Sequence, residues 1–201
     1  MSECLVQRLG VGYAAPYREL MLEAYERHPD AFLSSTAERA ALPLSWWQKR
    51  LDDNPEAKEK VFGAVSNENG QLLGVAGLSL DSRDKAAHKA TLFGMYVRRN
   101  ARGHGLGAQL VQAVLDEARR HPQLRVVQLT VTQGNAAAQH LYAAQGFQVF
   151  GIEPMAMRLG TEFLAKVHMW HRLKWTVMAR WRGVSAASAL VEKAVYFFAN
   201  S

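Results

Sequence analysis

The chain has 201 residues, of which 49% are hydrophobic and 21% charged, with one cysteine and a net charge of +6. This composition excludes a wholly disordered chain and a disulfide-held secreted scaffold, and no apolar run reaches the roughly 18 residues of a membrane-spanning helix. The basic excess favours an anionic partner, which could be nucleic acid, an acidic lipid or a phosphorylated small molecule. The first residues lack the layout of a secretion signal, so we expect a cytoplasmic protein.

Helical spacing of apolar residues indicates helices, and short apolar runs between turn residues indicate strands. In chain order we expect a strand at residues 5–9, a helix at 16–26, a loop with broken helix at 31–43, a helix capped by Ser45 and ending near Asn54, strands at 61–65, 72–80 and 89–97, a helix at 105–120, a strand at 126–131, a helix at 135–145, and strands at 147–152 and 163–173. This order predicts an α/β protein with a mixed sheet of about six or seven strands, flanked by about four helices.

Residues 174–201 differ from the rest of the chain in composition. They contain four basic residues and one acidic residue, and 186–198 are nearly all apolar. We expect either a helix or strand packed on the main core or across a dimer, a basic segment on a membrane surface, or a weakly ordered tail. The chain is therefore divided into a domain at residues 1–173 and a basic, apolar extension at 174–201.

A glycine-rich turn joins a predicted strand to a predicted helix at residues 97–110. Gly103, Gly105 and Gly107 allow the main chain to come close to a ligand. The first amides of the helix have no acceptor within the helix, and its dipole leaves partial positive charge there. The pattern is typical of a pyrophosphate site. Further donors could come from the side chains of Arg98, Arg99, Arg102 and His104.

Other glycine-rich motifs offer alternative interpretations of this turn. The simplest is a tight structural connection with no ligand. A dinucleotide-binding fold would place the motif in the first strand–helix unit and end the next strand on an acid, whereas here that strand ends at residues 130–132, Thr-Val-Thr. A P-loop would close on Gly-Lys-Ser/Thr, and Leu106-Gly107-Ala108 does not. The sequence thus excludes both nucleotide folds.

Two motifs together resemble the GNAT superfamily of N-acetyltransferases. Residues 102–107, Arg-Gly-His-Gly-Leu-Gly, are similar to the family's Arg/Gln-x-x-Gly-x-Gly/Ala motif, and residues 92–97 resemble its central strand. A second family signature, Asn-x-x-Ala-x-x-Leu-Tyr-x-x-x-Gly-Phe, is matched at Asn135, Ala138, Leu141, Tyr142, Gly146 and Phe147. The resemblance covers about residues 5–173 and implies a sheet that is splayed at the strands that bind the cofactor.

The resemblance implies acetyl-coenzyme A as co-substrate and no metal. Its pantetheine arm would hydrogen-bond to the main chain of Met95, Tyr96 and Val97, in the gap between strands 89–97 and 126–131. Its pyrophosphate would be held by the turn formed by Arg102, Gly103, His104, Gly105, Leu106 and Gly107, with Asn135 and Tyr142 contacting the cofactor from the far side. The negative charges of coenzyme A account for the basic excess without nucleic acid.

The resemblance also implies direct attack of a primary amine on the thioester in a ternary complex, with the Met95 amide as a donor to the oxyanion. Tyr142 matches the family's usual general acid, because a phenol of pKa near 10 can protonate a thiolate of pKa about 8.5; the alternative is a packed aromatic. Relatives often carry a glutamate on strand 89–97, and this strand has no carboxylate. Glu38, Asp81, Asp84 and His88 are the candidate bases, each also interpretable as a solvated loop residue, and a water relay is the further alternative.

The acceptor pocket should be built from residues 32–35, Trp46, Trp47 and the turn at Asp81. Two adjacent tryptophans on one helix cannot both face the core, so one borders either the pocket or a loop. The expected function is N-acetylation of a small-molecule amine, rather than a protein, with a homodimer as the oligomer to consider. A non-catalytic acyl-coenzyme A sensor is the alternative suggested by the missing carboxylate. A further alternative, a nucleic-acid-binding module, is supported only by the basic charge of the chain. Its affinity for nucleic acid would fall steeply with salt.

Overall fold

The computed structural model describes residues 4–173, so the expected extension at 174–201 lies outside the described residues. The strands are β1 (Cys4–Arg8), β2 (Glu59–Ser66), β3 (Leu72–Leu80), β4 (Lys89–Val97), β5 (Val126–Thr132), β6 (Gln148–Leu159) and β7 (Glu162–Arg172). The α-helices are α1 (Ala14–Arg27), α2 (Thr36–Ala40), α3 (Leu44–Lys49), α4 (Leu106–Arg119) and α5 (Ala136–Ala144), with short 3-10 helices at Val11–Tyr13, Asp84–Ala86 and Arg99–Ala101. No helix in the described part is long and apolar enough to cross a membrane.

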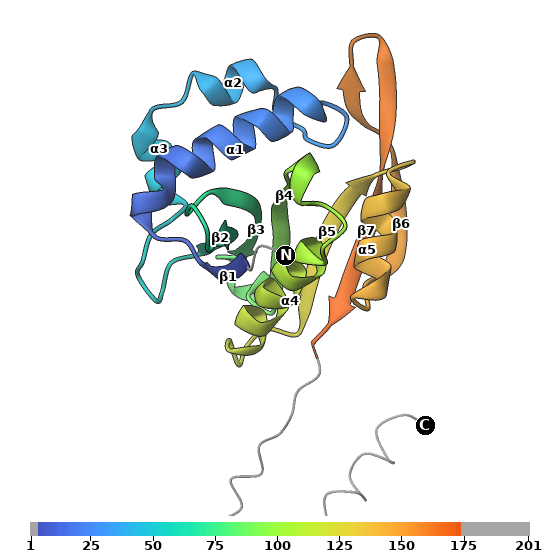
Figure 1. Cartoon of the computed structure of the whole chain (residues 1–201). Helices are drawn as coiled ribbons and strands as arrows, with labels where there is room; N and C mark the ends of the chain where they lie inside the picture. The colour runs from blue at the N-terminus through green and yellow to red at the C-terminus, as the bar shows by residue number, and fades with distance from the viewer. Residues whose placement is uncertain (1–3, 174–201) are drawn as a thin grey trace, which may run out of the picture.

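The strands form one seven-stranded sheet in the order β1-β2-β3-β4-β5-β7-β6 (Figure 1). Neighbouring strands run antiparallel except β4 and β5, which are parallel. The mixed sheet expected from the sequence is therefore confirmed. The hairpin of β2 and β3 turns at Asn67–Gly70, where the sequence predicted it.

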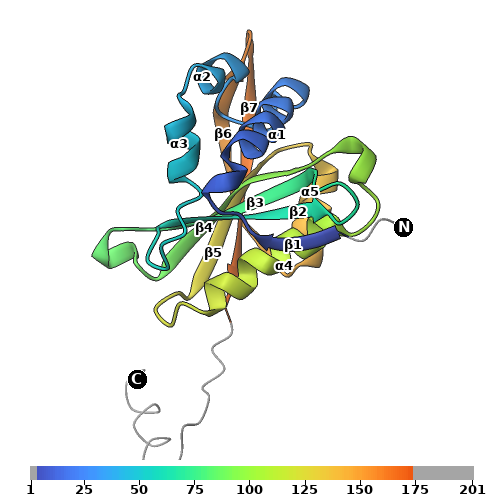
Figure 2. The same ribbon diagram turned by 60° about the vertical axis from the view of Figure 1, so that its left-hand side comes forward.

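Helices cover the sheet on both faces. In Figure 2, α1, α2 and α3 lie on one side of the sheet, and α4 and α5 lie on the other. Strand alternation explains both cores: Val61 and Val75 pack with α1 and α3, whereas Phe62 and Ala76, one residue further on, pack with α4. The buried face of α4 is the apolar face expected from the sequence: Leu106, Leu110, Val111, Val114, Leu115 and Ala118.

Two helix boundaries differ from the sequence expectation. The prediction that Ser45 caps a helix is wrong, because Pro43 is the N-cap residue of α3 and no side chain caps it. The same helix ends at Lys49 rather than near Asn54. Its end is explained by local polar bonds, since Asp52 Oδ1 accepts a hydrogen bond from the Asn54 amide at 3.0 Å and Asn54 Oδ1 accepts one from the Glu56 amide at 2.9 Å. Such bonds offer the backbone an alternative to helix.

The segment at residues 31–43 contains one short helix, α2. Ser35 Oγ accepts a hydrogen bond from the Glu38 amide at 3.2 Å, and Glu38 Oε2 accepts one from the Ser35 amide at 2.8 Å. This reciprocal pair is a capping box. The carboxylate of Glu38 is therefore engaged at the helix start.

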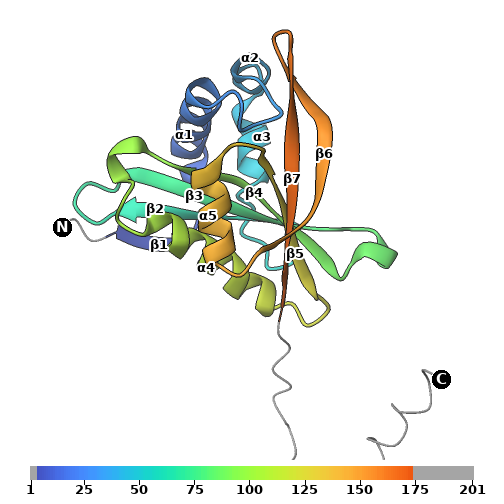
Figure 3. The same ribbon diagram turned by 90° about the vertical axis from the view of Figure 1, so that its right-hand side faces the viewer.

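Strand β6 is longer than the sequence indicated. It continues past residue 152 to Leu159 and pairs with β7 through a register shift between Glu153 and Met157. Pro154 is tolerated because β6 is the edge strand of the sheet. The β6–β7 hairpin extends along the side of the molecule that carries α1, α2 and α3 (Figure 3).

A buried ion pair joins β2 to α4. Lys60 and Glu117 are 4% and 7% exposed, and Lys60 Nζ donates a hydrogen bond to Glu117 Oε1 at 2.6 Å. His121 Nε2 lies 3.1 Å from Lys60 Nζ and 3.3 Å from Glu117 Oε1. Each charge is thus compensated within the cluster.

Candidate functional site

Strands β4 and β5 part after a short parallel contact. They pair only at Lys89–Thr91 and Val126–Gln128. Further along β4, the register with β3 shifts between Val75 and Gly77, where Gly94 and Met95 stand opposite a single β3 residue. Gly94 has φ +61°, a conformation that favours glycine, as in a β-bulge. Because a bulge bends its strand, the sheet opens here into a cleft.

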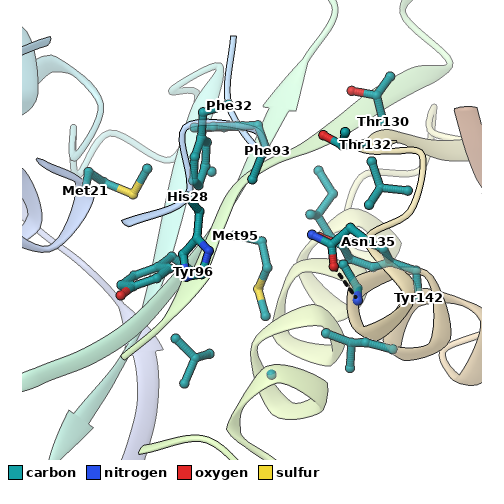
Figure 4. A pocket seen from close by; sticks show the side chains of 18 of the residues that line it. Met21, His28, Phe32, Phe93, Met95, Tyr96, Thr130, Thr132, Asn135 and Tyr142 are labelled. Carbon is teal, nitrogen blue, oxygen red and sulfur yellow. Dashed lines mark hydrogen bonds between the residues drawn. The ribbon is translucent and has the colours of Figure 1, made fainter. Parts of the chain in front are cut away.

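The cleft has a volume of about 1230 Å³ and reaches from the start of α4 to helices α1, α2 and α3. Pockets for one small ligand measure about 300–1,000 Å³, so this space exceeds the need of a single small molecule. All the residues predicted to bind the cofactor line it except His104: Met95, Tyr96, Val97, Arg102, Gly103, Gly105, Leu106, Gly107, Asn135 and Tyr142. His104 is exposed outside the cleft. Figure 4 shows Met95 in the space between β4 and the helix that carries Tyr142.

The start of α4 presents uncapped amides to the cleft. Its N-cap residue is Gly105, with φ +75° and ψ 0°, and no side chain caps the helix. A Cβ atom added to Gly107 would lie 3.2 Å from Leu141 Cδ2 and 3.3 Å from Met95 Cε. Because Gly107 has no side chain, Leu141 and Met95 can pack close to its backbone. The free amides and the positive end of the helix dipole make this a place for an anion.

Of the basic side chains near this turn, only Arg102 lines the cleft. Its Nε donates to the Val97 carbonyl at 2.9 Å, and its Nη2 lies 3.1 Å from His28 Nε2. Arg98 instead pairs with Glu19 at 2.9 Å and Glu23 at 3.4 Å. Arg98, Arg99 and His104 do not line the cleft: α1 supplies partners to Arg98, and the other two residues are exposed.

Helix α5 brings Asn135 and Tyr142 to the opposite wall. Asn135 is the N-cap residue, and its Oδ1 accepts a hydrogen bond from the Ala138 amide at 3.1 Å (Figure 4). Tyr142 is 6% exposed, and its ring packs edge-on against Phe147. Burial raises the pKa of the Tyr142 hydroxyl above its ordinary value of 10.0, so the group holds its proton at neutral pH.

The other end of the cleft lies among the early helices. Trp47 is 1% exposed and packs edge-on against Tyr17, whereas the adjacent Trp46 is half-buried. Both rings border the cleft, together with Phe32 and Ser34. One tryptophan is thus a core residue that also reaches the cleft, and the other belongs to the cleft wall.

None of the four candidate bases lines the cleft. Glu38 is engaged in the capping box, and Asp84 and His88 lie in the β3–β4 connection. Asp81 also lies there and bonds Arg83 at 2.6 Å, and these hydrogen bonds lower the pKa of its carboxyl well below the usual range. This turn, which was expected to contribute to the acceptor pocket, adjoins the end of β4 remote from the bulge and does not line the cleft.

The residue that sequence reasoning missed is Glu59, the first residue of β2. It pairs with Ser79 on β3, which pairs with Thr91 on β4, and all three line the cleft. A row of polar side chains therefore crosses three strands. The signal was available, since extending the hairpin register back from the Asn67–Gly70 turn places residue 59 near residue 79.

A loop between α1 and α2 is tied across the cleft to β5 and β7. Thr132 Oγ1 donates to the Asp30 carbonyl at 2.6 Å. Lys166 Nζ donates to Thr132 Oγ1 at 2.7 Å and to the Ala31 carbonyl at 3.1 Å. Burial lowers the pKa of Lys166. We call this segment, residues 28–34, the strap.

No group of three or more His, Cys, Asp or Glu side chains within residues 4–173 is arranged to hold a metal ion. The cleft instead combines an anion-binding helix start, unpaired strand edges and a protonated phenol. That combination suits a long anionic ligand with amide groups in its middle.

Residues 17–147 match the model of the Acetyltransferase (GNAT) family. An L-methionine sulfoximine/L-methionine sulfone acetyltransferase from Pseudomonas aeruginosa is 37% identical over 91 residues, 45% of this chain and 52% of that protein. An L-amino acid N-acetyltransferase from Escherichia coli is 27% identical over 105 residues, 52% of this chain and 62% of that protein. The match thus spans little more than half the length of these relatives.

Solved structures share the fold. A Salmonella typhimurium protein, described as an acetyltransferase and solved with acetyl-coenzyme A as its cofactor, superposes with a TM-score of 0.70 at 24% identity, covering 92% of this chain and 99% of that one. The family match includes β4, the glycine turn, α4 and α5, which build the cleft described above. This chain therefore belongs to the acetyltransferase (GNAT) family.

Proposed function

We propose that this protein transfers the acetyl group of acetyl-coenzyme A to the primary amine of a small molecule, in a ternary complex. The observation that carries the proposal is the meeting, in one cleft, of the parted strands β4 and β5, the uncapped start of α4 and the buried Tyr142. The volume of about 1230 Å³ supports simultaneous binding of two substrates. The names of the relatives, which act on methionine derivatives and amino acids, support a small amine.

The described residues fit acetyl-coenzyme A. Amides at Leu106 and Gly107 would bind its pyrophosphate, and the edge of β4 from Met95 to Val97, which is not paired with β5, would bind the amides of its pantetheine arm. Asn135 would contact it from α5. When bound, it supplies an activated acetyl thioester.

Three groups of this chain would serve the reaction. The Tyr142 hydroxyl would donate its proton to the departing thiolate; burial keeps it protonated but also makes it a weaker acid, so the proton transfer would have to accompany cleavage of the C–S bond. The Met95 amide, which lies at the bulge in β4, would donate to the oxyanion. Glu59, through the Ser79–Thr91 row, would receive the proton that the amine must lose; it replaces the four bases expected from the sequence.

Addition of acetyl-coenzyme A should raise the melting temperature, because the ligand binds only the folded state. At 100 times Kd the stabilisation is about 2.7 kcal/mol, which corresponds to roughly 5–10 °C for a domain of this size. Differential scanning fluorimetry measures the shift. An unchanged melting temperature at millimolar ligand would argue against cofactor binding.

Activity is tested by thiol release with a panel of primary amines. We expect release that depends on the amine and a product that is heavier by one acetyl group in mass spectrometry. Binding of acetyl-coenzyme A without transfer to any amine would favour the alternative function, a non-catalytic acyl-coenzyme A sensor.

The variant Gly105→Val should lose cofactor affinity beyond its loss of stability. Gly105 has φ +75°, so a β-branched side chain adds strain of about 1–2 kcal/mol and crowds the anion site. Gly160→Val is the matched control, because Gly160 has φ +61° and open space around it, in the turn between β6 and β7. We expect similar melting temperatures for both variants and weaker coenzyme A binding by calorimetry only for Gly105→Val. Equal loss of binding in both would make the role of Gly105 purely structural.

The proposal includes a cytoplasmic location and a homodimer. A single cysteine, which cannot form an intrachain disulfide, suits a reducing compartment. The edge strand β6 exposes Val149, Phe150 and Ile152, and exposed apolar residues on a sheet edge are typical of an interface. Light scattering of the full chain tests the dimer.

A further inference from the structure

Two arginines flank Trp46 where the cleft meets α2 and α3. The Cζ atom of Arg39 lies 4.7 Å from the centre of the Trp46 ring, and that of Arg50 lies 4.4 Å from the same centre. Arg50 Cζ is also 5.1 Å from the centre of the Phe93 ring. Cation–π contacts of this kind hold both guanidinium groups in place on the cleft wall.

The two arginines differ in what neutralises them. Arg50 Nη1 lies 3.4 Å from Glu59 Oε2, and the Arg50 side chain also bonds the buried hydroxyl of Tyr17. Arg50 and Glu59 therefore compensate each other across the floor of this end of the cleft.

Arg39 has no such carboxylate. Within residues 4–173 no acidic side chain lies at ion-pair distance from it, and its Nε is buried without a hydrogen-bond partner. The neighbouring Glu38 is committed to the capping box at Ser35, and the Arg39 side chain lies near the Tyr25 hydroxyl. A buried donor without a partner is unfavourable, and an anionic ligand that bonds Arg39 would offset this.

The surface beside Arg39 is aromatic. Tyr25 and Phe32 pack edge-on at 4.9 Å, and Phe93 and Trp46 complete the wall. In Figure 4, Phe32 and Phe93 lie close together at the same end of the cleft. An acceptor bound here would place an apolar group against these rings.

We propose that the acceptor amine carries a carboxylate, which Arg39 binds, and an apolar or aromatic group, which the rings of Phe32, Trp46 and Phe93 cover. The inference rests on the proposed transfer reaction and names the substrate class for it. A guanidinium fork matches a carboxylate in geometry and charge, and the resulting charge-assisted hydrogen bonds are among the strong ones. Glu59, which is paired with Arg50, lines the same cleft.

Binding of amine-free probes tests the carboxylate site without any transfer. With coenzyme A present, calorimetry compares 3-phenylpropanoate with 3-phenylpropanamide, which lacks the charge. We expect the acid to bind wild-type protein about 10- to 100-fold more tightly than the amide, and the preference to disappear in Arg39→Gln. Arg39→Lys keeps the positive charge but lacks the planar guanidinium group that bonds a carboxylate through two N–H donors. We therefore expect an intermediate preference for the acid over the amide. Arg119→Gln is the matched control, since Arg119 pairs with Asp116 on α4 outside the cleft.

Transfer is then measured with L-phenylalanine and L-phenylalaninamide. The ratio of their kcat/KM values should fall at least tenfold in Arg39→Gln and stay constant in Arg119→Gln; comparing ratios cancels the different amine pKa values of the two substrates. Equal binding of acid and amide, or an unchanged ratio in Arg39→Gln, overturns the carboxylate site whether or not transfer occurs. Selective binding of the acid without transfer to any amine would support the carboxylate site and contradict the proposed transferase activity.

Discussion

Replacing Tyr142 by phenylalanine should lower kcat by about 10²–10³, the size of effect that a positioned proton donor supplies. The ring stays in its place against Phe147, so KM for acetyl-coenzyme A should change little. Because burial raises the pKa of Tyr142, the wild-type enzyme should keep its rate up to pH 10, with no loss from ionisation of this hydroxyl. Steady-state kinetics by thiol release measure both expectations.

The matched control is Tyr13→Phe. It removes a hydroxyl that accepts a hydrogen bond from Gln7 Nε2 at 3.1 Å, outside the cleft. We expect wild-type kcat from this variant. A Tyr142→Phe enzyme with full kcat would show that water or another group protonates the leaving thiolate, and Tyr142 would then be a packing residue.

Removing Glu117 should destabilise the fold by about 3–5 kcal/mol, because Glu117→Leu leaves the ammonium of Lys60 buried without its counter-charge. Urea denaturation measures this change. The double variant Lys60→Met, Glu117→Leu removes both charges and should recover most of the loss. Asp116→Asn is the control, since Asp116 is an exposed neighbour paired with Arg119 and such pairs contribute about 0–1 kcal/mol.

The same pair makes stability depend on pH in the acid range. Burial alone would raise the pKa of Glu117, but the hydrogen bonds and charges of Lys60 and His121 outweigh it and lower the pKa below 4.5. The ionised carboxylate therefore stabilises the fold at pH values above 4.5, and this contribution is lost as the pH falls through the lowered pKa. Wild-type stability should drop in that window, and the double variant should lose this part of the slope. An identical slope in both proteins would contradict the role of Glu117.

The sequence predicted the parts of the fold that depend on local patterns. The apolar face of α4 and the hairpin at Asn67–Gly70 follow from periodicity and turn residues. The glycine turn before α4 was also readable, because its conformation requires residues such as Gly105. These features need no knowledge of distant contacts.

The errors came from features that depend on tertiary contacts. Arg98 resembles a phosphate ligand in sequence, but Glu19 and Glu23 on α1 take its guanidinium. Asp81 is a candidate base in the sequence, but in the folded sheet its turn lies at the end of β4 that is remote from the bulge. Glu59 was overlooked because its partners, Ser79 and Thr91, are 20 and more positions away and become neighbours only through strand pairing.

The parting of β4 and β5 creates two bare strand edges within a continuous sheet. On the outside of a protein, such edges recruit foreign strands and promote aggregation. Here α5, the start of α4 and the strap surround them, and the strap is fastened to Thr132 and Lys166. These surrounding elements shield the two edges from pairing with strands of other molecules. Backbone groups that would promote aggregation on the outside of a protein are thus kept available inside the cleft.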